Sequence, residues 1–139
     1  MLQHLRALHV EILRRLDQLD RLTQQAEPPI AELPAARLAL SRASRARTLF
    51  IEQNLPEIIG SAPPSRLVRI RALQHDTALQ MDRSANHVST WSLQAIASDW
   101  PAYRRASAEI RDAMRLRIKE EAALLYPILS ALPLQRLTG

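Results

Sequence analysis

The chain contains no cysteine, which excludes disulfides, thiolate nucleophiles, and zinc or iron–sulfur sites held by cysteine. It has only two glycines, too few for a glycine-rich phosphate-binding loop. No run of eighteen or more apolar residues occurs, so we expect no membrane-spanning segment. Residues 1–6 lack the basic start and apolar block of a signal peptide, so we expect a cytoplasmic protein.

The composition that is present favours helices. Leucine, alanine and arginine dominate, and 47% of the residues are hydrophobic, which is enough for a packed core. A chain of 139 residues therefore predicts one domain spanning residues 1–139. The net charge of +5 permits an anionic partner, but the arginines are spread along the chain without a nucleic-acid motif. We expect solvated arginines and no nucleic-acid partner.

Proline clusters divide the sequence into four long segments. The clusters lie at 27–34, 60–64 and 98–101, and each is typical of a connection. They predict helices over about 2–26, 35–59, 65–97 and 101–131, with Ser65 and Asp99 as N-caps. Three short links between four long helices predict an all-α, antiparallel up-down-up-down four-helix bundle.

Apolar periodicity supports these segments. In the first helix, leucines and isoleucine recur at three- and four-residue steps, at Leu5, Leu8, Ile12, Leu16 and Leu19. The last segment repeats this pattern, the second shows a face of alanines that ends at Phe50, and the third is interrupted by polar residues. Each predicted helix therefore has a side that faces the centre of the bundle.

Several ionisable residues fall on these inner faces. His9 and His75 lie among apolar neighbours of the first and third segments, and Glu57 continues the face that contains Phe50. Arg117 and Glu121 lie in the middle of the last apolar stripe. A buried charge costs several kcal/mol unless it is paired or bound to a metal, so we expect the five residues to meet around one interior point.

Two stretches resemble the hemerythrin-like, or HHE cation-binding, domain family. Residues 5–13 (LRALHVEIL) are similar to its opening helix. Residues 117–127 (RIKEEAALLYP) are similar to its closing helix, where a histidine precedes a Glu-Glu pair and a Leu-Tyr-Pro end. The resemblance covers nearly the whole chain and implies a four-helix bundle with a non-haem di-iron centre. It also implies binding or sensing of oxygen or another small diatomic molecule.

The resemblance places His9, Glu57, His75 and Glu121 on metal-ligand positions. Imidazole and carboxylate groups on rigid helices suit iron. The chain also departs from the family, because Gln53 and Arg117 stand where histidines are expected. In addition, Pro56 precedes Glu57, so the second helix is expected to bend or end there and to redirect that carboxylate.

Two interpretations of this centre remain open. In the first, the guanidinium of Arg117 neutralises Glu121, Glu57 or both as iron would have done, and the protein is a metal-free sensor-like or structural module. In the second, His9, Glu57, His75 and Glu121 keep a reduced iron site and Arg117 turns away from it. Neither interpretation predicts an enzyme, because no catalytic arrangement or substrate cleft is evident in the sequence.

Two metal-free alternatives compete with the family resemblance. A phosphotransfer bundle would need an exposed histidine, for which His87 is the best candidate. A protein-interaction or signalling bundle would use Trp91, Trp100 and Tyr103 as a hot-spot patch, although aromatic residues at helix ends more often close a core. The protein partner and the oligomeric state stay open at this point.

Overall fold

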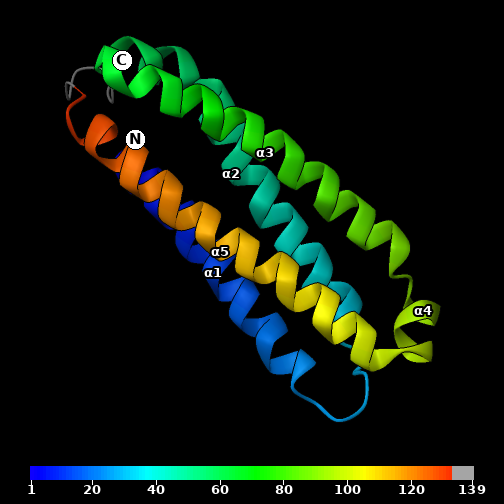
Figure 1. Ribbon diagram of the computed structural model, residues 1–139. Helices are drawn as coiled ribbons and strands as arrows, with labels where there is room; N and C mark the ends of the chain where they lie inside the picture. Colours follow the sequence, from blue (N-terminus) through cyan, green and yellow to red (C-terminus); the bar gives the residue numbers. More distant parts are fainter. Residues whose placement is uncertain (133–139) are drawn as a thin grey trace.

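The protein is all-helical over the part described, as the composition predicts. The computed structural model describes residues 1–132. Figure 1 shows that the long helices lie along the length of the molecule. No strand occurs within these residues. The described residues form five helices rather than the four predicted: α1 (Leu2–Thr23), α2 (Leu33–Ser61), α3 (Pro64–Thr90), α4 (Leu93–Ser98) and α5 (Trp100–Ser130).

The extra helix arises where the third predicted segment breaks. The prediction of one helix over 65–97 is wrong, because α3 ends at Thr90 and two residues separate it from α4. Ser92 caps α4, since its Oγ accepts a hydrogen bond from the Ala95 N–H at 3.1 Å. Asp99 caps α5 as predicted, whereas Ser65 lies inside α3 and makes no cap.

Pro56 does not end α2. The helix continues through it to Ser61, and α5 likewise contains Pro127. Both prolines are exposed, so the carbonyl that loses its helical partner can be hydrated. Glu57 therefore stays on a helix rather than in a connection.

Three helices carry regular buried stripes. The steps are three or four residues long, the spacing that keeps one side of a helix against its neighbours. Helix α1 lies along both α2 and α5, and α2 also contacts α5. On α1 the stripe is Leu5, His9, Ile12, Leu16, Leu19 and Thr23, and on α2 it is Leu33, Ala36, Leu40, Ala43, Arg47 and Phe50.

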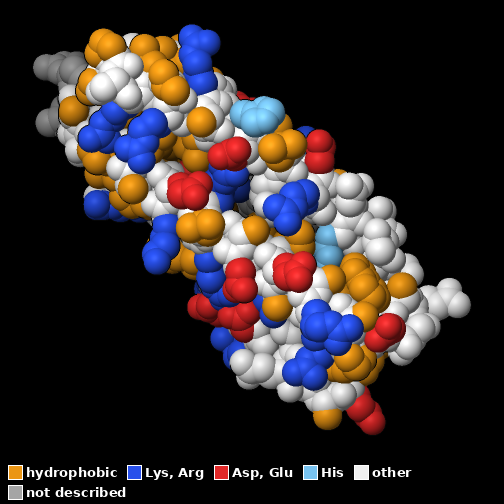
Figure 2. All heavy atoms as spheres, in the orientation of Figure 1, with side chains coloured by type: hydrophobic (Ala, Val, Ile, Leu, Met, Phe, Trp, Pro, Cys, Tyr) orange, Lys and Arg blue, Asp and Glu red, His pale blue; other side chains and the backbone are white. Residues whose placement is uncertain are grey.

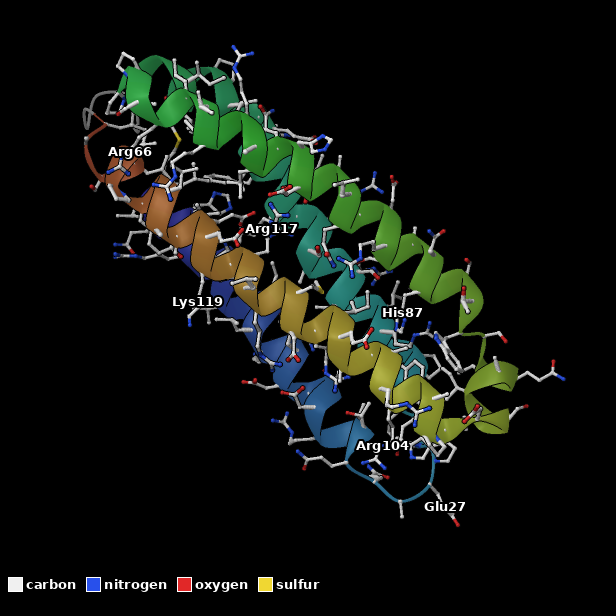
Figure 3. All side chains as sticks on the ribbon, viewed as in Figure 1. Glu27, Arg66, His87, Arg104, Arg117 and Lys119 are labelled. Carbon is white, nitrogen blue, oxygen red and sulfur yellow. The ribbon has the colours of Figure 1, made fainter. Side chains whose placement is uncertain are left out.

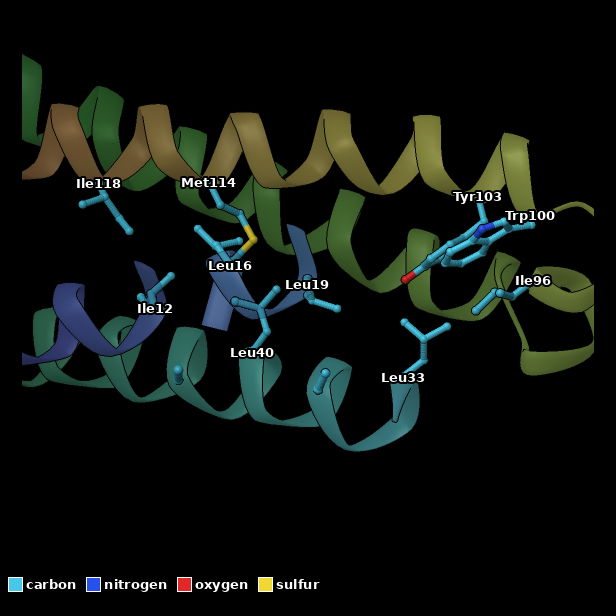
Figure 4. Close-up of a cluster of buried hydrophobic side chains, with 12 residues drawn as sticks. Ile12, Leu16, Leu19, Leu33, Leu40, Ile96, Trp100, Tyr103, Met114 and Ile118 are labelled. Atoms are coloured by element: carbon cyan, nitrogen blue, oxygen red, sulfur yellow. The ribbon is translucent and has the colours of Figure 1, made fainter. Parts of the chain in front are cut away.

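The apolar interior consists of two clusters. One contains Ile12, Ala43 and Ile118 and reaches the aromatic residues beside α4, as Figure 4 shows. The other contains Leu5 and Phe50 and continues towards the C-terminal end of α5. Between the two clusters, buried polar residues occupy the inner faces: His9 on α1, Arg47 and Thr48 on α2, and Glu121 on α5.

Helix α3 is far less buried than the other long helices. Its buried residues are Ile70 and Leu73, whereas Val68 is 75% exposed. Figure 2 shows hydrophobic side chains at the surface of the molecule, among charged ones. It lies against α5, and its contact with α2 is sparser. No helix within residues 1–132 is both long enough and apolar enough to cross a membrane.

Candidate functional site

The two apolar clusters are separated by a layer of polar side chains at the centre of the protein. His9 of α1, Arg47 of α2 and Glu121 of α5 each occupy one position of a buried stripe, and Tyr126 adds a hydroxyl from α5. We call these four residues the polar layer. His9, Arg47 and Glu121 are 2%, 5% and 1% exposed, so water does not screen their interactions.

Glu121 is the acceptor at the centre of the polar layer. Nη1 of Arg47 donates to both of its oxygens at 3.1 Å, and Nε2 of His9 lies 2.8 Å from Oε1. Arg47 also donates from Nη2 to Ser44 Oγ at 3.2 Å, while its Nε is buried without a hydrogen-bond partner among the described residues. One guanidinium thus balances one carboxylate inside the core, where an unpaired charge would be costly.

The second nitrogen of His9 extends the network to Tyr126. Nδ1 lies 2.6 Å from the phenol oxygen. A neutral imidazole with its proton on Nε2 satisfies both contacts, because it donates to Glu121 and accepts from the phenol. Burial raises the pKa of Tyr126, Arg6 above its ring opposes this, and Glu121 raises the pKa further. The phenol therefore keeps its proton to higher pH than usual.

Arg117 is buried, as its position predicts, but its partners are different from those expected. Its Nη1 donates to the Leu73 carbonyl at 3.0 Å and lies 3.4 Å from Thr77 Oγ1, both on α3. It forms no ion pair with a described carboxylate. Figure 3 shows Arg117 between α5 and α3. The hypothesis that Arg117 neutralises Glu121 is therefore wrong, and Arg47 occupies that place.

The other predicted site residues do not join the polar layer. His75 is exposed on α3, so the prediction that it faces the interior is wrong, and Gln53 is exposed on α2. Glu57 is half-buried, and its buried Oε2 has no hydrogen-bond partner among the described residues. Of the five residues expected at one interior point, only His9 and Glu121 are in contact.

These side chains do not fit the iron centre that the family resemblance implies. Both oxygens of Glu121 already accept from a guanidinium, whose positive charge opposes a cation at the same carboxylate. His75 cannot complete a ligand shell from the surface. Within residues 1–132, no group of three or more His, Asp or Glu side chains is arranged to hold a metal ion.

The far end of the core is closed by aromatic rings. Trp100 and His87 both stack on Tyr103, with centroids 5.7 Å away in each pair. Trp100 and Tyr103 are buried, so they belong to the core and not to an exposed hot-spot patch. His87 is half-buried rather than exposed, which contradicts the surface that phosphotransfer requires.

Arg47 is the residue that the sequence reasoning missed. The face that begins at Leu33 places Arg47 in an unbroken alternation of three- and four-residue steps, between Ala43 and Phe50. A strict heptad reading of α2 would have found it. The prediction instead followed the face of alanines that ends at Phe50, which consists of Ala39, Ala43 and Ala46. Only Ala43 of these is buried.

Comparisons with models of known families, with curated proteins and with solved structures found no match to this chain.

Proposed function

We propose that this chain is a metal-free, hemerythrin-like antiparallel four-helix bundle with a sensor-like or structural role and no catalytic activity. The single observation that carries the proposal is the contact between Arg47 Nη1 and both oxygens of Glu121 at 3.1 Å. A guanidinium supplies the positive charge that a bridging metal would supply in a hemerythrin-like domain. Because Arg47 is covalently fixed on α2, the charge is present without any cofactor.

The resemblance in the sequence and the burial of the two shared positions support this proposal together. His9 and Glu121 lie in the stretches that resemble the first and last helices of the family, and their side chains are 2.8 Å apart. The two other ligand positions implied by the resemblance, Glu57 and His75, do not meet them. Two of the four implied ligands, His9 and Glu121, are thus in contact, and Arg47 binds the carboxylate of Glu121.

The polar layer also favours a structural task over catalysis. Apart from Arg47 Nε, the nitrogens of His9 and Arg47 and the oxygens of Glu121 all take part in hydrogen bonds within the protein. Such a network fixes how α1, α2 and α5 align, because a shift along any helix axis leaves a buried charge unpaired.

Metal analysis of the purified full-length protein tests the proposal. Protein prepared without chelators is expected to contain iron far below one ion per chain, and to show no visible absorption band. Glu121→Gln is expected to leave the metal content unchanged, as is the matched control Glu120→Gln at the exposed neighbouring position. Stoichiometric iron with an oxo-bridge absorption band that disappears only in Glu121→Gln would falsify the metal-free function.

A further inference from the structure

A cavity of about 540 Å³ lies between α2, α3 and α5 on one side of the polar layer. This volume falls in the range of small-molecule sites, which are mostly apolar with a few fixed polar groups. Its walls include Leu40, Met81, Tyr103, Ile110 and Met114. The low burial of α3 explains the space, since this helix contributes few side chains to the core.

Charge in the lining of this cavity has one sign. Five arginines line it and no aspartate or glutamate does. Two of the buried arginines are neutralised from outside the lining, because Arg47 pairs with Glu121 and Arg111 Nε donates to Asp20 at 2.8 Å. Arg45 is exposed to water. Arg117 is the third buried arginine that lines the cavity, and it forms no ion pair with a residue of 1–132.

The hydrogen bonds of Arg117 leave one edge of its guanidinium free. Nη1 donates a hydrogen bond to the Leu73 carbonyl of α3. Nε and Nη2 make no hydrogen bond with a described residue, and Arg117 lines the cavity. Two parallel N–H groups on one edge of a guanidinium match the two oxygens of a carboxylate.

A second observation indicates a positive field at the other end of the same cavity. Burial, then Arg37 and Arg111, hold the pKa of His87 below its usual value. His87 lines the cavity, and Arg37 and Arg111, the two charges that lower its pKa, are both positive. The cavity therefore favours a negatively charged ligand.

We propose that the α2–α3–α5 cavity binds a small amphipathic monocarboxylate, with its carboxylate on the Nε–Nη2 edge of Arg117 and its apolar body against Leu40, Ile110 and Met114. One buried arginine without an ion pair calls for one negative charge, which favours a carboxylate over a phosphate dianion. The apolar walls require a hydrocarbon body, either an alkyl chain or an aromatic ring. Arg37 and Arg45 at the lining attract the anion from solution.

Isothermal titration calorimetry with octanoate tests this site on the full-length protein. We expect octanoate to bind once per chain, and about tenfold or more tightly than 1-octanol, because the alcohol lacks the charge-assisted hydrogen bonds. 2-Naphthoate tests whether an aromatic ring can replace the alkyl chain as the hydrocarbon body. Binding of either acid supports the site. Equal affinity for octanoate and 1-octanol, or no binding of either acid, overturns the proposal. Tighter binding of octyl phosphate overturns the monocarboxylate assignment.

Variants of Arg117 locate the binding group. Arg117→Met is expected to weaken octanoate about tenfold or more while leaving 1-octanol unchanged. Arg104→Met is the control, since Arg104 is exposed. It lies near the N-terminal end of α5, away from Arg117, as Figure 3 shows. Should Arg117→Met not fold, Arg117→Lys keeps the charge but loses the two-pronged edge, and is expected to bind octanoate more weakly than wild type. Unchanged octanoate affinity in a folded Arg117 variant overturns the assignment.

The carboxylate site and the metal-free function fail separately. Iron in the purified protein would contradict the function proposed above without changing the preference for octanoate over 1-octanol. Loss of that preference would remove the carboxylate site and leave the Arg47–Glu121 pair untouched.

Discussion

Arg47 and Glu121 stand 74 positions apart in the sequence, and one guanidinium nitrogen bridges both oxygens of the carboxylate. The pair lies at the boundary between the two apolar clusters. Burying such a pair is a poor source of net stability, because desolvation offsets the attraction. Its value lies in specificity, since other alignments of α2 and α5 leave a charge unpaired.

Arg47→Met is expected to destabilise the protein by about 3–5 kcal/mol, because it leaves Glu121 charged and unpaired in the core. Urea unfolding at pH 7 measures the change. Arg42→Met, at an exposed position of the same helix, is expected to change stability by less than about 0.5 kcal/mol. Similar effects of the two variants would show that Arg47 does not neutralise Glu121.

Removing the carboxylate charge is expected to rescue the loss of Arg47. The double variant Arg47→Met with Glu121→Gln should be more stable than Arg47→Met alone, because the amide carries no charge and still accepts from His9. A double-mutant cycle measures the coupling, which should be favourable by about 0.5–3 kcal/mol. Additive effects would contradict a direct interaction.

Tyr126→Phe is expected to cost about 1–3 kcal/mol, because Nδ1 of His9 loses its buried partner. Tyr103→Phe is the matched control, since no hydrogen bond to the Tyr103 hydroxyl is present within the described residues. In wild-type protein, an absorbance titration should show Tyr126 ionising above its ordinary pKa. The pKa of Tyr126 is higher in the folded protein than in the unfolded chain. The contribution of Tyr126 to stability is therefore complete below its unfolded pKa and is lost as pH rises through its folded pKa.

Asp20 is expected to contribute to unfolding in acid. Burial works to raise the pKa of this carboxyl, but hydrogen bonds and charge from Arg115 and Arg111 outweigh burial and lower it. A lowered folded pKa means stability that is present above about pH 4 and is lost as pH falls through the folded value. Asp20→Asn should therefore flatten the acid limb of the stability curve, whereas exposed Asp82→Asn should leave its slope unchanged.

His87 is expected to oppose folding as pH falls below about 6.5. Burial, then Arg37 and Arg111, lower its folded pKa, so the unfolded chain takes up a proton first. The free energy of unfolding should drop from about pH 6.5 downwards, and less steeply in His87→Gln. Proton NMR of wild-type protein and of Arg37→Gln should show His87 titrating at higher pH in the variant. An identical titration in both would rule out Arg37 as a cause.

The burial of His9 and Glu121 followed directly from the sequence. Each lies in an apolar stripe whose steps match a helix, so the position of its neighbours fixes its direction. The same reasoning failed for His75 because it assumed that α3 is packed like the other helices. Periodicity describes one helix at a time, and it does not report that the neighbouring helices leave α3 largely in water.

The sequence by itself determined that the chain is helical, where proline and Asp99 start or separate helices, and which sides of α1 and α5 are buried. Those properties depend on hydrogen bonds and apolar contacts within a few residues of each position. Only the tertiary structure decided that Arg47, and not Arg117, neutralises Glu121. Two arginines of equal charge differ there only by the direction in which their helices present them, and that direction depends on residues far away in the chain.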